Sequence, residues 1–216
     1  MIICMYNEIS DKNDNGVTNS VFCVTNRKLC EEDFLTRIER IAKAKPRGII
    51  LREKDLSREE YKILAKEVMF ICEKYNVSCI LHSFVDVAIE LQARAIHLPL
   101  DRLLQLRDDE KAKFKVIGAS CHSMQDAIRA KEAGCTYIVV GHIFETDCKK
   151  GLAGRGLGFL QEVCECVDIP VYAIGGITSE NIGSVREVGA VGVCIMSGLM
   201  RCEEPEKYLA NMKEIG

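Results

Sequence analysis

The chain has 216 residues, of which 48% are hydrophobic, and its formal net charge is −3 at pH 7. This length suits one domain with a large core, and the mixed charges offer no basic face for nucleic acid. No apolar run reaches the roughly 20 residues that span a bilayer, and the short apolar start lacks the basic segment of a signal peptide. We therefore expect a cytoplasmic protein that binds neither nucleic acid nor a membrane.

Eight short apolar runs rich in β-branched residues predict strands that are buried on both faces. Longer segments with helical periodicity lie between most of them. Ser57 and Ser123 are expected to cap their helices, and Gly134 and Gly189 to end theirs. The predicted strands cover residues 21–25, 48–52, 78–82, 94–98, 115–119, 137–141, 170–175 and 191–196, and the helices cover 32–43, 57–75, 85–92, 124–133, 157–166, 180–188 and 205–215.

Eight strands that alternate with helices favour a parallel sheet closed into a single (β/α)8 TIM barrel over residues 19–216. An open, doubly wound sheet is the alternative. Such a sheet usually has five or six strands and often a glycine fingerprint after the first strand, and this chain has neither. Residues 1–18 form an N-terminal extension to which the sequence assigns no role.

The chain contains twelve cysteines, which is a high number for its length. None of them forms a Cys-x-x-Cys pair or a spacing typical of a zinc site. Cys23, Cys79 and Cys194 lie in apolar strand-like runs, where cysteine acts as a small buried hydrophobe. We expect most of the cysteines to be structural thiols in a reducing compartment.

The four histidines of the chain lie at the C-terminal ends of four consecutive predicted strands, where barrel enzymes build their active sites. A single histidine near a strand end is more often a hydrogen-bonded structural residue. Four on one rim favour an active site, because imidazole suits proton transfer near neutral pH. The residues are His82, His97, His122 and His142.

Two loops after the seventh and eighth strands are typical of a phosphate site. Gly175 and Gly176 follow the seventh strand, and Ser197 follows the eighth. In phosphate-binding barrels, these loops present backbone N–H groups to the anion, and glycine allows a close approach. Two ordinary turns are the alternative interpretation.

The loop over residues 141–158 is long and rich in glycine and cations, which is typical of a lid or an anion clamp. Thr146, Lys149, Lys150 and Arg155 are its candidates for contact with a phosphate or carboxylate. A solvated, flexible connection is the alternative.

Arg52 and Lys54 alternate along the segment after the second strand, so both are candidates to point into the barrel mouth. Two cations there would suit a substrate carboxylate or phosphate. A surface ion-pair cluster with Glu53 and Asp55 is an equally good interpretation.

Four stretches of the chain carry a resemblance to a known family. They read GHIFETDCKKGLAGRGLG (141–158), GASCHS (118–123), IPVYAIGGIT (169–178) and VCIMSGL (193–199). From Val21 to Pro205 the chain resembles the thiamin phosphate synthase superfamily, and within it the thiazole tautomerase branch, often called TenI. The resemblance implies either of two activities. The synthase couples a pyrimidine diphosphate to a thiazole phosphate with Mg²⁺, whereas the tautomerase isomerises a carboxythiazole phosphate without a cofactor.

The residues that hold Mg²⁺ in the synthase distinguish the two activities. The synthase has Asn-Asp after the third strand, where this chain has His82 and Ser83. It also has an acidic pair after the histidine of the fourth strand, where this chain has Asp101 followed by Arg102. These differences favour the tautomerase.

Other residues keep the synthase as the alternative. The segment LREKDLS (51–57) is close to the synthase motif that grips the diphosphate. Thr146, Cys148 and Lys149 overlay its Thr-x-Thr-Lys motif, with cysteine in place of the second threonine.

The resemblance implies roles for the candidate residues in the tautomerase. His122 would transfer the proton, and Gly175, Gly176 and Ser197 would hold the phosphate of a small phosphorylated thiazole. Arg52 or Lys149 would hold the carboxylate, with Lys54 and Thr146 as further substrate-binding candidates. No metal or other cofactor is expected unless the synthase alternative holds, and a homodimer is common among small barrels of this type. A non-catalytic barrel that binds a phosphorylated ligand is the third hypothesis.

Overall fold

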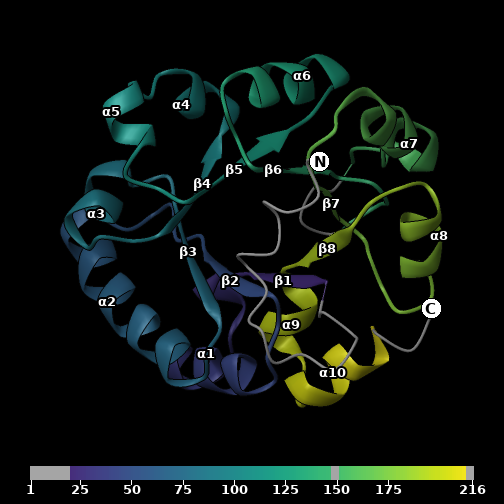
Figure 1. Cartoon of the computed structure of the whole chain (residues 1–216). Helices are drawn as coiled ribbons and strands as arrows, with labels where there is room; N and C mark the ends of the chain where they lie inside the picture. Colours follow the sequence, from purple (N-terminus) through teal and green to yellow (C-terminus); the bar gives the residue numbers. More distant parts are fainter. Residues whose placement is uncertain (1–19, 147–150, 213–216) are drawn as a thin grey trace.

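The computed structural model describes residues 20–146 and 151–212, so the N-terminal extension predicted for residues 1–18 lies outside it. Within these residues, eight parallel strands follow one another in chain order round a closed barrel (Figure 1). The sheet closes because β8 pairs with β1, which confirms the single TIM barrel and excludes an open sheet. The strands are β1 (Val21–Val24), β2 (Gly48–Leu51), β3 (Ser78–His82), β4 (Ala95–Pro99), β5 (Val116–Cys121), β6 (Tyr137–Gly141), β7 (Val171–Ile174) and β8 (Gly192–Ile195).

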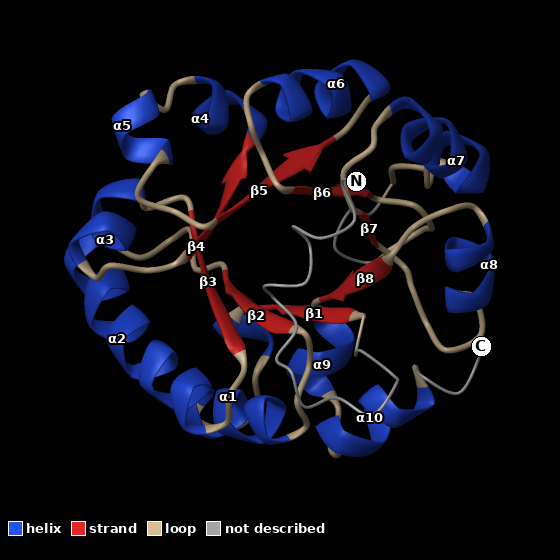
Figure 2. Ribbon diagram, in the orientation of Figure 1, coloured by secondary structure: helices blue, strands red, loops and turns tan. Residues whose placement is uncertain are grey.

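Helices surround the ring of strands, as Figure 2 shows, and bury the outward face of the sheet. No helix among the described residues has the length and apolar character needed to cross a membrane. The helices are η2 (Arg27–Leu29), α1 (Phe34–Lys43), α2 (Arg58–Lys74), α3 (Val85–Glu90), α4 (Leu100–Leu104), α5 (Asp108–Lys111), α6 (Met124–Glu132), α7 (Gly156–Cys166), α8 (Ile182–Glu187), α9 (Ser197–Arg201) and α10 (Pro205–Asn211).

Four short helices were not predicted from the sequence: η2, α4, α5 and α9. Each has between three and five residues. An amphipathic repeat needs more than one turn to be recognised, because its signal is the recurrence of apolar residues every three or four positions. Elements of this length therefore leave no periodic signal in the sequence.

Closure of the barrel divides the residues of each strand between two cores. In β1, Val21 and Cys23 face the helices, whereas Phe22 and Val24 face the barrel interior. The same alternation holds along the other strands, because successive side chains of a strand point to opposite faces. Most strand residues are apolar because both faces of the strands are buried. The buried interior residues are Phe22, Val24, Ile50, Ile80, Ala95, Tyr137, Val139, Tyr172 and Cys194.

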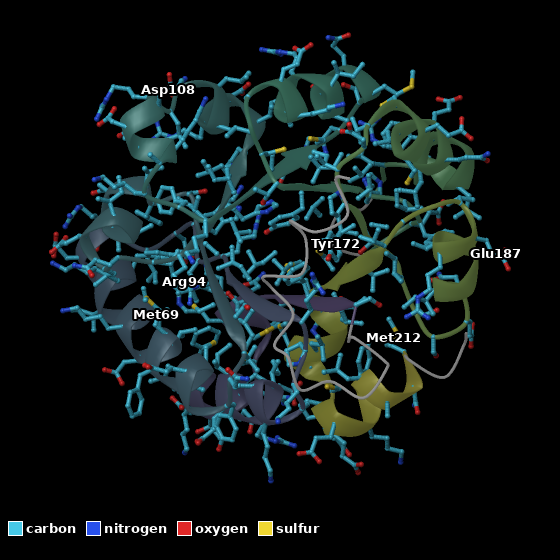
Figure 3. The ribbon with its side chains drawn as sticks, in the orientation of Figure 1. Met69, Arg94, Asp108, Tyr172, Glu187 and Met212 are labelled. Atoms are coloured by element: carbon cyan, nitrogen blue, oxygen red, sulfur yellow. The ribbon has the colours of Figure 1, made fainter. Side chains whose placement is uncertain are left out.

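Three aromatic rings and an arginine fill the N-terminal end of the barrel. Phe22 lies 4.8 Å from Tyr172 and 5.6 Å from Tyr137 between ring centroids. Arg47 lies over the rings of Phe22 and Tyr172, at 5.9 and 6.0 Å from their centroids. Figure 3 labels Tyr172, which points toward the centre of the ring of strands. Because this end is filled, a ligand can enter the barrel only from the C-terminal ends of the strands.

The predicted helix ends are confirmed by local geometry. Ser57 accepts a hydrogen bond from the backbone of Glu60 and completes a capping box, and Ser123 caps α6. Gly134 and Gly189 have φ of 86° and 102°, the left-handed conformation that follows a helix and favours glycine. These residues fix where α2 and α6 begin and where the chain leaves α6 and α8.

The ten cysteines among the described residues are all free, and five of them are buried. Burial raises the pKa of Cys135 to about 12, so its thiol stays protonated and unreactive. The expectation that most cysteines are structural thiols fits these residues.

We predict that Ser57→Ala lowers the free energy of unfolding by about 1 kcal/mol, because the N-terminus of the 17-residue helix α2 loses its cap. Urea denaturation at pH 7 measures the change. Ser57→Asp is the matched control, since aspartate caps equally well and should stay within about 0.5 kcal/mol of wild type. An equal loss in both variants would contradict the role of the cap.

Candidate active site

A cavity of about 890 Å³ opens at the C-terminal ends of the strands. Each of the eight strands contributes at least one residue to its wall. This volume suits a small metabolite, and the position is where barrel enzymes bind their substrates. One such residue from each strand, in the order β1 to β8, is Val24, Ile50, His82, His97, Ser120, Val139, Ile174 and Cys194.

All four histidines line this cavity, as their spacing in the sequence suggested. His97 lies inside the barrel, where its Nδ1 shares a hydrogen bond with the Tyr137 hydroxyl at 3.0 Å and its Nε2 with Ser120 Oγ at 2.9 Å. Gly118 makes room for this group, because a Cβ there would lie 2.5 Å from His97 Nδ1 and closer still to Tyr137. Both ring nitrogens are occupied, which favours a structural role for His97.

His82 lies beside His97, with the two ring centroids 5.7 Å apart. Its Nδ1 shares a hydrogen bond of 2.6 Å with Ser83 Oγ. Burial lowers the pKa of His82 to about 2, helped by the nearby His97 and Lys54, and burial lowers that of His97 to about 3. Both imidazoles are therefore neutral at physiological pH.

His122 follows β5 at the rim of the cavity and differs from the buried pair because it is exposed. Its Nδ1 lies 3.0 Å from the Gly141 carbonyl oxygen, which can only accept a hydrogen bond. Nδ1 therefore carries a proton, and Nε2 has no hydrogen-bond partner within the described residues. The backbone N–H of His122 donates to Asp126 at 2.8 Å, which fixes the residue at the start of α6. This arrangement holds an imidazole, a side chain suited to proton transfer, at the rim of the cavity.

His142 contributes to the packing of the loop after β6. It is buried, and its Nε2 donates to the Leu152 carbonyl oxygen at 3.2 Å. Its Nδ1 is buried without a hydrogen-bond partner within the described part of the chain. The contact to Leu152 ties the two ends of the loop together.

The alternation of the segment after β2 separates its cations from its carboxylates. Arg52 and Lys54 line the cavity. Glu53 points the other way, is buried, and accepts hydrogen bonds from Thr25 Oγ1 at 2.7 Å and from the Arg27 backbone at 3.0 Å. The structure therefore supports the interpretation in which both cations face the mouth. Partial burial and the neighbouring Arg52 lower the pKa of Lys54.

Gly175 and Gly176 line the cavity with Ser197. The backbone conformation and the close packing at these two positions already require glycine. Their φ angles are 102° and 65°, and a Cβ would lie 2.3 Å from His142 Cβ in the first case and 2.3 Å from the Glu145 oxygen in the second. Packing against the loop after β6 therefore requires glycine at both positions, whether or not an anion binds there. Ser197 begins α9, so the first N–H groups of that helix lack intrahelical partners and face the same end of the cavity.

The loop over residues 141–158 places its candidates differently. Thr146 lines the cavity. Arg155 does not: it is exposed, and its guanidinium lies 5.1 Å from the centroid of the Phe159 ring. Lys149 and Lys150 lie outside the described residues, so their predicted roles remain predictions.

Sequence reasoning missed several residues of the cavity. Ser120 lines the cavity from β5, and Tyr137 of β6 lies deeper in the barrel, where it contacts His97. Both occupy inward positions, which the period-two pattern counted back from the strand ends would have found. Tyr208 comes from the distant helix α10 and packs over Gly198, where a Cβ would lie 2.1 Å from its hydroxyl. No local signal in the sequence indicates that contact.

The cavity does not provide the donor set that a divalent cation prefers. Its carboxylates are Asp101 and Asp126, and Asp126 already binds the backbone of His122. Mg²⁺ is held by oxygen ligands, commonly carboxylates, together with substrate phosphates. Within residues 20–146 and 151–212, no group of three or more His, Cys, Asp or Glu could hold a metal ion. The described residues do not fit a protein-bound Mg²⁺ site.

Comparison with known proteins gives a consistent family. The thiamine monophosphate synthase family matches residues 21–199. The thiamine-phosphate synthase 2 of Streptococcus pneumoniae is 32% identical over 198 residues, covering 90% of this chain and 94% of that protein. The thiamine-phosphate synthase of Methanobrevibacter smithii is 32% identical over 199 residues, covering 92% and 95%.

A solved structure supports the same relationship. The thiamine phosphate pyrophosphorylase of Pyrococcus furiosus superposes with a TM-score of 0.78 at 25% identity, covering 92% of this chain and 95% of that one. The match supports the superfamily that the sequence motifs indicated, but it does not single out the tautomerase branch. The names of these relatives favour the synthase, which the sequence analysis ranked second.

We predict that the buried histidines make the barrel sensitive to acid. Below the ordinary histidine pKa of 6.5, the unfolded chain takes up protons on His82 and His97, whereas the folded barrel does not. Stability is therefore present above pH 6.5 and falls as the pH falls, by about 1.4 kcal/mol per pH unit for each histidine. Urea denaturation between pH 7 and pH 5 measures the slope.

In His97→Asn, unfolding should take up about one proton fewer than in wild type, so the unfolding free energy should depend less steeply on pH. In the double variant His82→Asn, His97→Asn, the uptake should be smaller by about two protons. The carboxylates contribute equally to all three proteins, so the differences isolate the histidines. Parallel slopes in the three proteins would contradict burial of neutral histidines.

Proposed function

The chain belongs to the thiamine monophosphate synthase family, and on this premise we propose that it is an enzyme of thiamin biosynthesis that acts on a phosphorylated thiazole. The proposed reaction is the tautomerase one, in which a non-aromatic carboxythiazole phosphate becomes its aromatic isomer. The observation that supports this choice is His122, which lines the cavity rim and whose Nδ1 donates to the Gly141 carbonyl oxygen, leaving Nε2 without a partner among the described residues.

The proposed proton shift needs one group that acts first as base and then as acid. Nε2 of His122 removes the proton from the ring carbon that bears the carboxylate. The electron pair of that C–H bond shifts into the ring's double bonds, and the π pair of the exocyclic double bond moves onto the exocyclic carbon, where it takes up a proton. The imidazolium then returns a proton to the exocyclic carbon, so no proton is gained or lost overall. The hydrogen bond from Nδ1 to the Gly141 carbonyl oxygen holds the ring and stabilises its cationic form.

The rest of the cavity supplies binding groups for the two anionic ends of such a substrate. The N–H groups at the start of α9, with Gly176 and Ser197, suit the phosphate. Arg52 and Lys54 line the same cavity from the segment after β2, which β1 alone separates from β8, and they suit the carboxylate. A fixed carboxylate orients the C–H bond toward the base, which is a positioning effect.

The second candidate is the Mg²⁺-dependent coupling of a thiamine-phosphate synthase. The names of the relatives favour it, and the paired cations Arg52 and Lys54 would also suit a diphosphate. The donor set of the described residues argues against it, because Asp101 is the one cavity carboxylate without a described partner. We therefore rank the synthase second on chemistry, although the comparisons favour it.

We predict that the purified protein accelerates aromatisation of the carboxythiazole phosphate with EDTA in excess, and that His122→Ala lowers kcat about 10²- to 10⁴-fold. Absorbance of the aromatic product follows the reaction. Met124→Ala is the control, since Met124 is exposed two residues away on α6 and should leave the rate unchanged.

The outcome separates the two candidates. Product that forms only when Mg²⁺ and the pyrimidine diphosphate are both supplied would establish the synthase and overturn the tautomerase. Full activity in His122→Ala would overturn the assignment of the base.

We also predict that Arg52→Gln raises KM about 10- to 100-fold, the effect of losing one charged hydrogen bond to the substrate. Steady-state kinetics with the same substrate measure it. Arg107→Gln, which removes an exposed arginine outside the cavity wall, is the matched control. If Arg52→Gln left both KM and kcat unchanged, Arg52 would not bind the substrate.

A further inference from the structure

One ring nitrogen of His82 is open to the cavity and has no partner. His82 is 4% exposed and lines the cavity from the end of β3. Its Nδ1 is engaged with Ser83 Oγ at 2.6 Å, and within the described residues no hydrogen bond reaches its Nε2. Nε2 is also not one of the polar atoms of these residues that are fully buried without a partner. The atom therefore faces the cavity, where a ligand can form a hydrogen bond with it.

Ser83 holds the His82 ring in a defined orientation. Ser83 has a φ of 69°, a left-handed conformation that is uncommon for a residue other than glycine. Its backbone N–H donates to the His97 carbonyl oxygen at 3.1 Å, and its side chain lies against the His82 ring. Within residues 20–146 and 151–212, His82 Nδ1 is the acceptor that the Ser83 hydroxyl reaches. A hydroxyl that donates to Nδ1 leaves the ring proton on Nε2, so this geometry favours an N–H that points into the cavity.

Two cations lie beside this nitrogen. Strands β2 and β3 are neighbours in the barrel (Figure 1), and their register pairs Leu51 with Leu81. The next residues along the two strands, Arg52 and His82, are therefore neighbours as well. Both line the cavity, as does Lys54, two residues after Arg52. This part of the wall offers donors from three side chains, a set that suits an anion.

The His82 ring stays neutral in these surroundings. Burial lowers the pKa of His82 to about 2, and the neighbouring His97 and the two cations act in the same direction. A neutral ring with its proton on Nε2 and with Nδ1 occupied has no free lone pair, so it is not a second base beside His122. It donates one hydrogen bond of fixed direction and keeps its own proton.

We propose that His82 is a catalytic residue whose Nε2–H donates a hydrogen bond to the carboxylate of the substrate. This inference rests on the proposed tautomerase function and names a group that meets the charge created in the reaction. When His122 takes the proton from the carbon that bears the carboxylate, the electron pair of the broken C–H bond spreads over the ring, the exocyclic carbon and the carboxylate oxygens. The hydrogen bond from His82 strengthens as this charge develops, and the charge disappears when the exocyclic carbon takes up the proton.

Nitrogen NMR of the full chain with nitrogen-15 histidine tests the donor without any substrate. At about pH 7, His82 should be neutral, with its proton on Nε2. Ser83→Gly retains the left-handed backbone and removes the hydroxyl, so both tautomers of His82 should appear. A wild-type His82 with its proton on Nδ1 would overturn the proposal, and an unchanged tautomer in Ser83→Gly would contradict the role of Ser83.

Variants of His82 test its part in the reaction. His82→Phe keeps a planar ring against His97 but has no N–H, whereas the amide of His82→Gln retains a donor. His82→Phe should lower kcat about 100-fold with a smaller change in KM, and His82→Gln should recover about 10-fold of this loss. Circular dichroism and urea denaturation verify that both variants fold. A kcat of wild-type size in folded His82→Phe would overturn the catalytic role.

A binding measurement separates failure of this inference from failure of the proposed function. Calorimetry compares the aromatic carboxythiazole phosphate with the same thiazole phosphate without its carboxylate. Wild type should bind the first about 100-fold more tightly, and His82→Phe should reduce this preference about 10-fold without weakening the second. Equal preferences in the two proteins would overturn the contact, whatever the activity. A wild type that shows this pattern but no isomerisation would overturn the tautomerase function and leave the contact in place.

Discussion

The pairing of β8 with β1 is the constraint on which the rest of this structure depends. Closure gives every strand residue either an interior or an exterior position, and the interior holds only a limited volume of side chains. Aromatic rings and Arg47 fill its N-terminal end, so a ligand has access only at the other end. Gly118 determines which side chains form the floor of the cavity, because the absence of a side chain there makes room for the imidazole of His97 and the ring of Tyr137.

The electrostatics of the mouth follow from the same alternation. Consecutive residues after β2 point to opposite sides, so Glu53 is buried against Arg27 and Thr25 while Arg52 faces the cavity. The outward ion pairs keep the carboxylates of this segment, Glu53 and Asp55, away from the cavity and leave its cations to a ligand. Burial keeps His82 and His97 neutral, so they add no competing charge. The result is a cavity suited to an anionic substrate, with an exposed imidazole at its rim.

The coupling reaction and the proton shift could both use this barrel and its anion-binding groups, and only a few residues distinguish the two. A coupling reaction that releases diphosphate needs a cation to neutralise the leaving group, and hence carboxylates to hold it. A proton shift needs a base of suitable pKa and a fixed substrate. The described cavity offers groups for a proton shift, an imidazole and cations that could fix the substrate, more fully than carboxylates that could hold a cation. The names of the relatives describe the first reaction, so the tautomerase proposal rests on the chemistry of particular positions and not on overall similarity.

The sequence by itself determined the strands, their number and the barrel, because strands that are buried on both faces require short apolar runs, and these recur along the chain. It also located the four histidines and the two cations, since a residue at a strand end must lie at the mouth of a closed barrel. Only the tertiary structure separated these histidines into a buried pair, a loop contact and an exposed base. The partners that decide this, such as Gly141 for His122 and Ser120 for His97, come from neighbouring strands, and the distance between strands is not encoded in any local pattern.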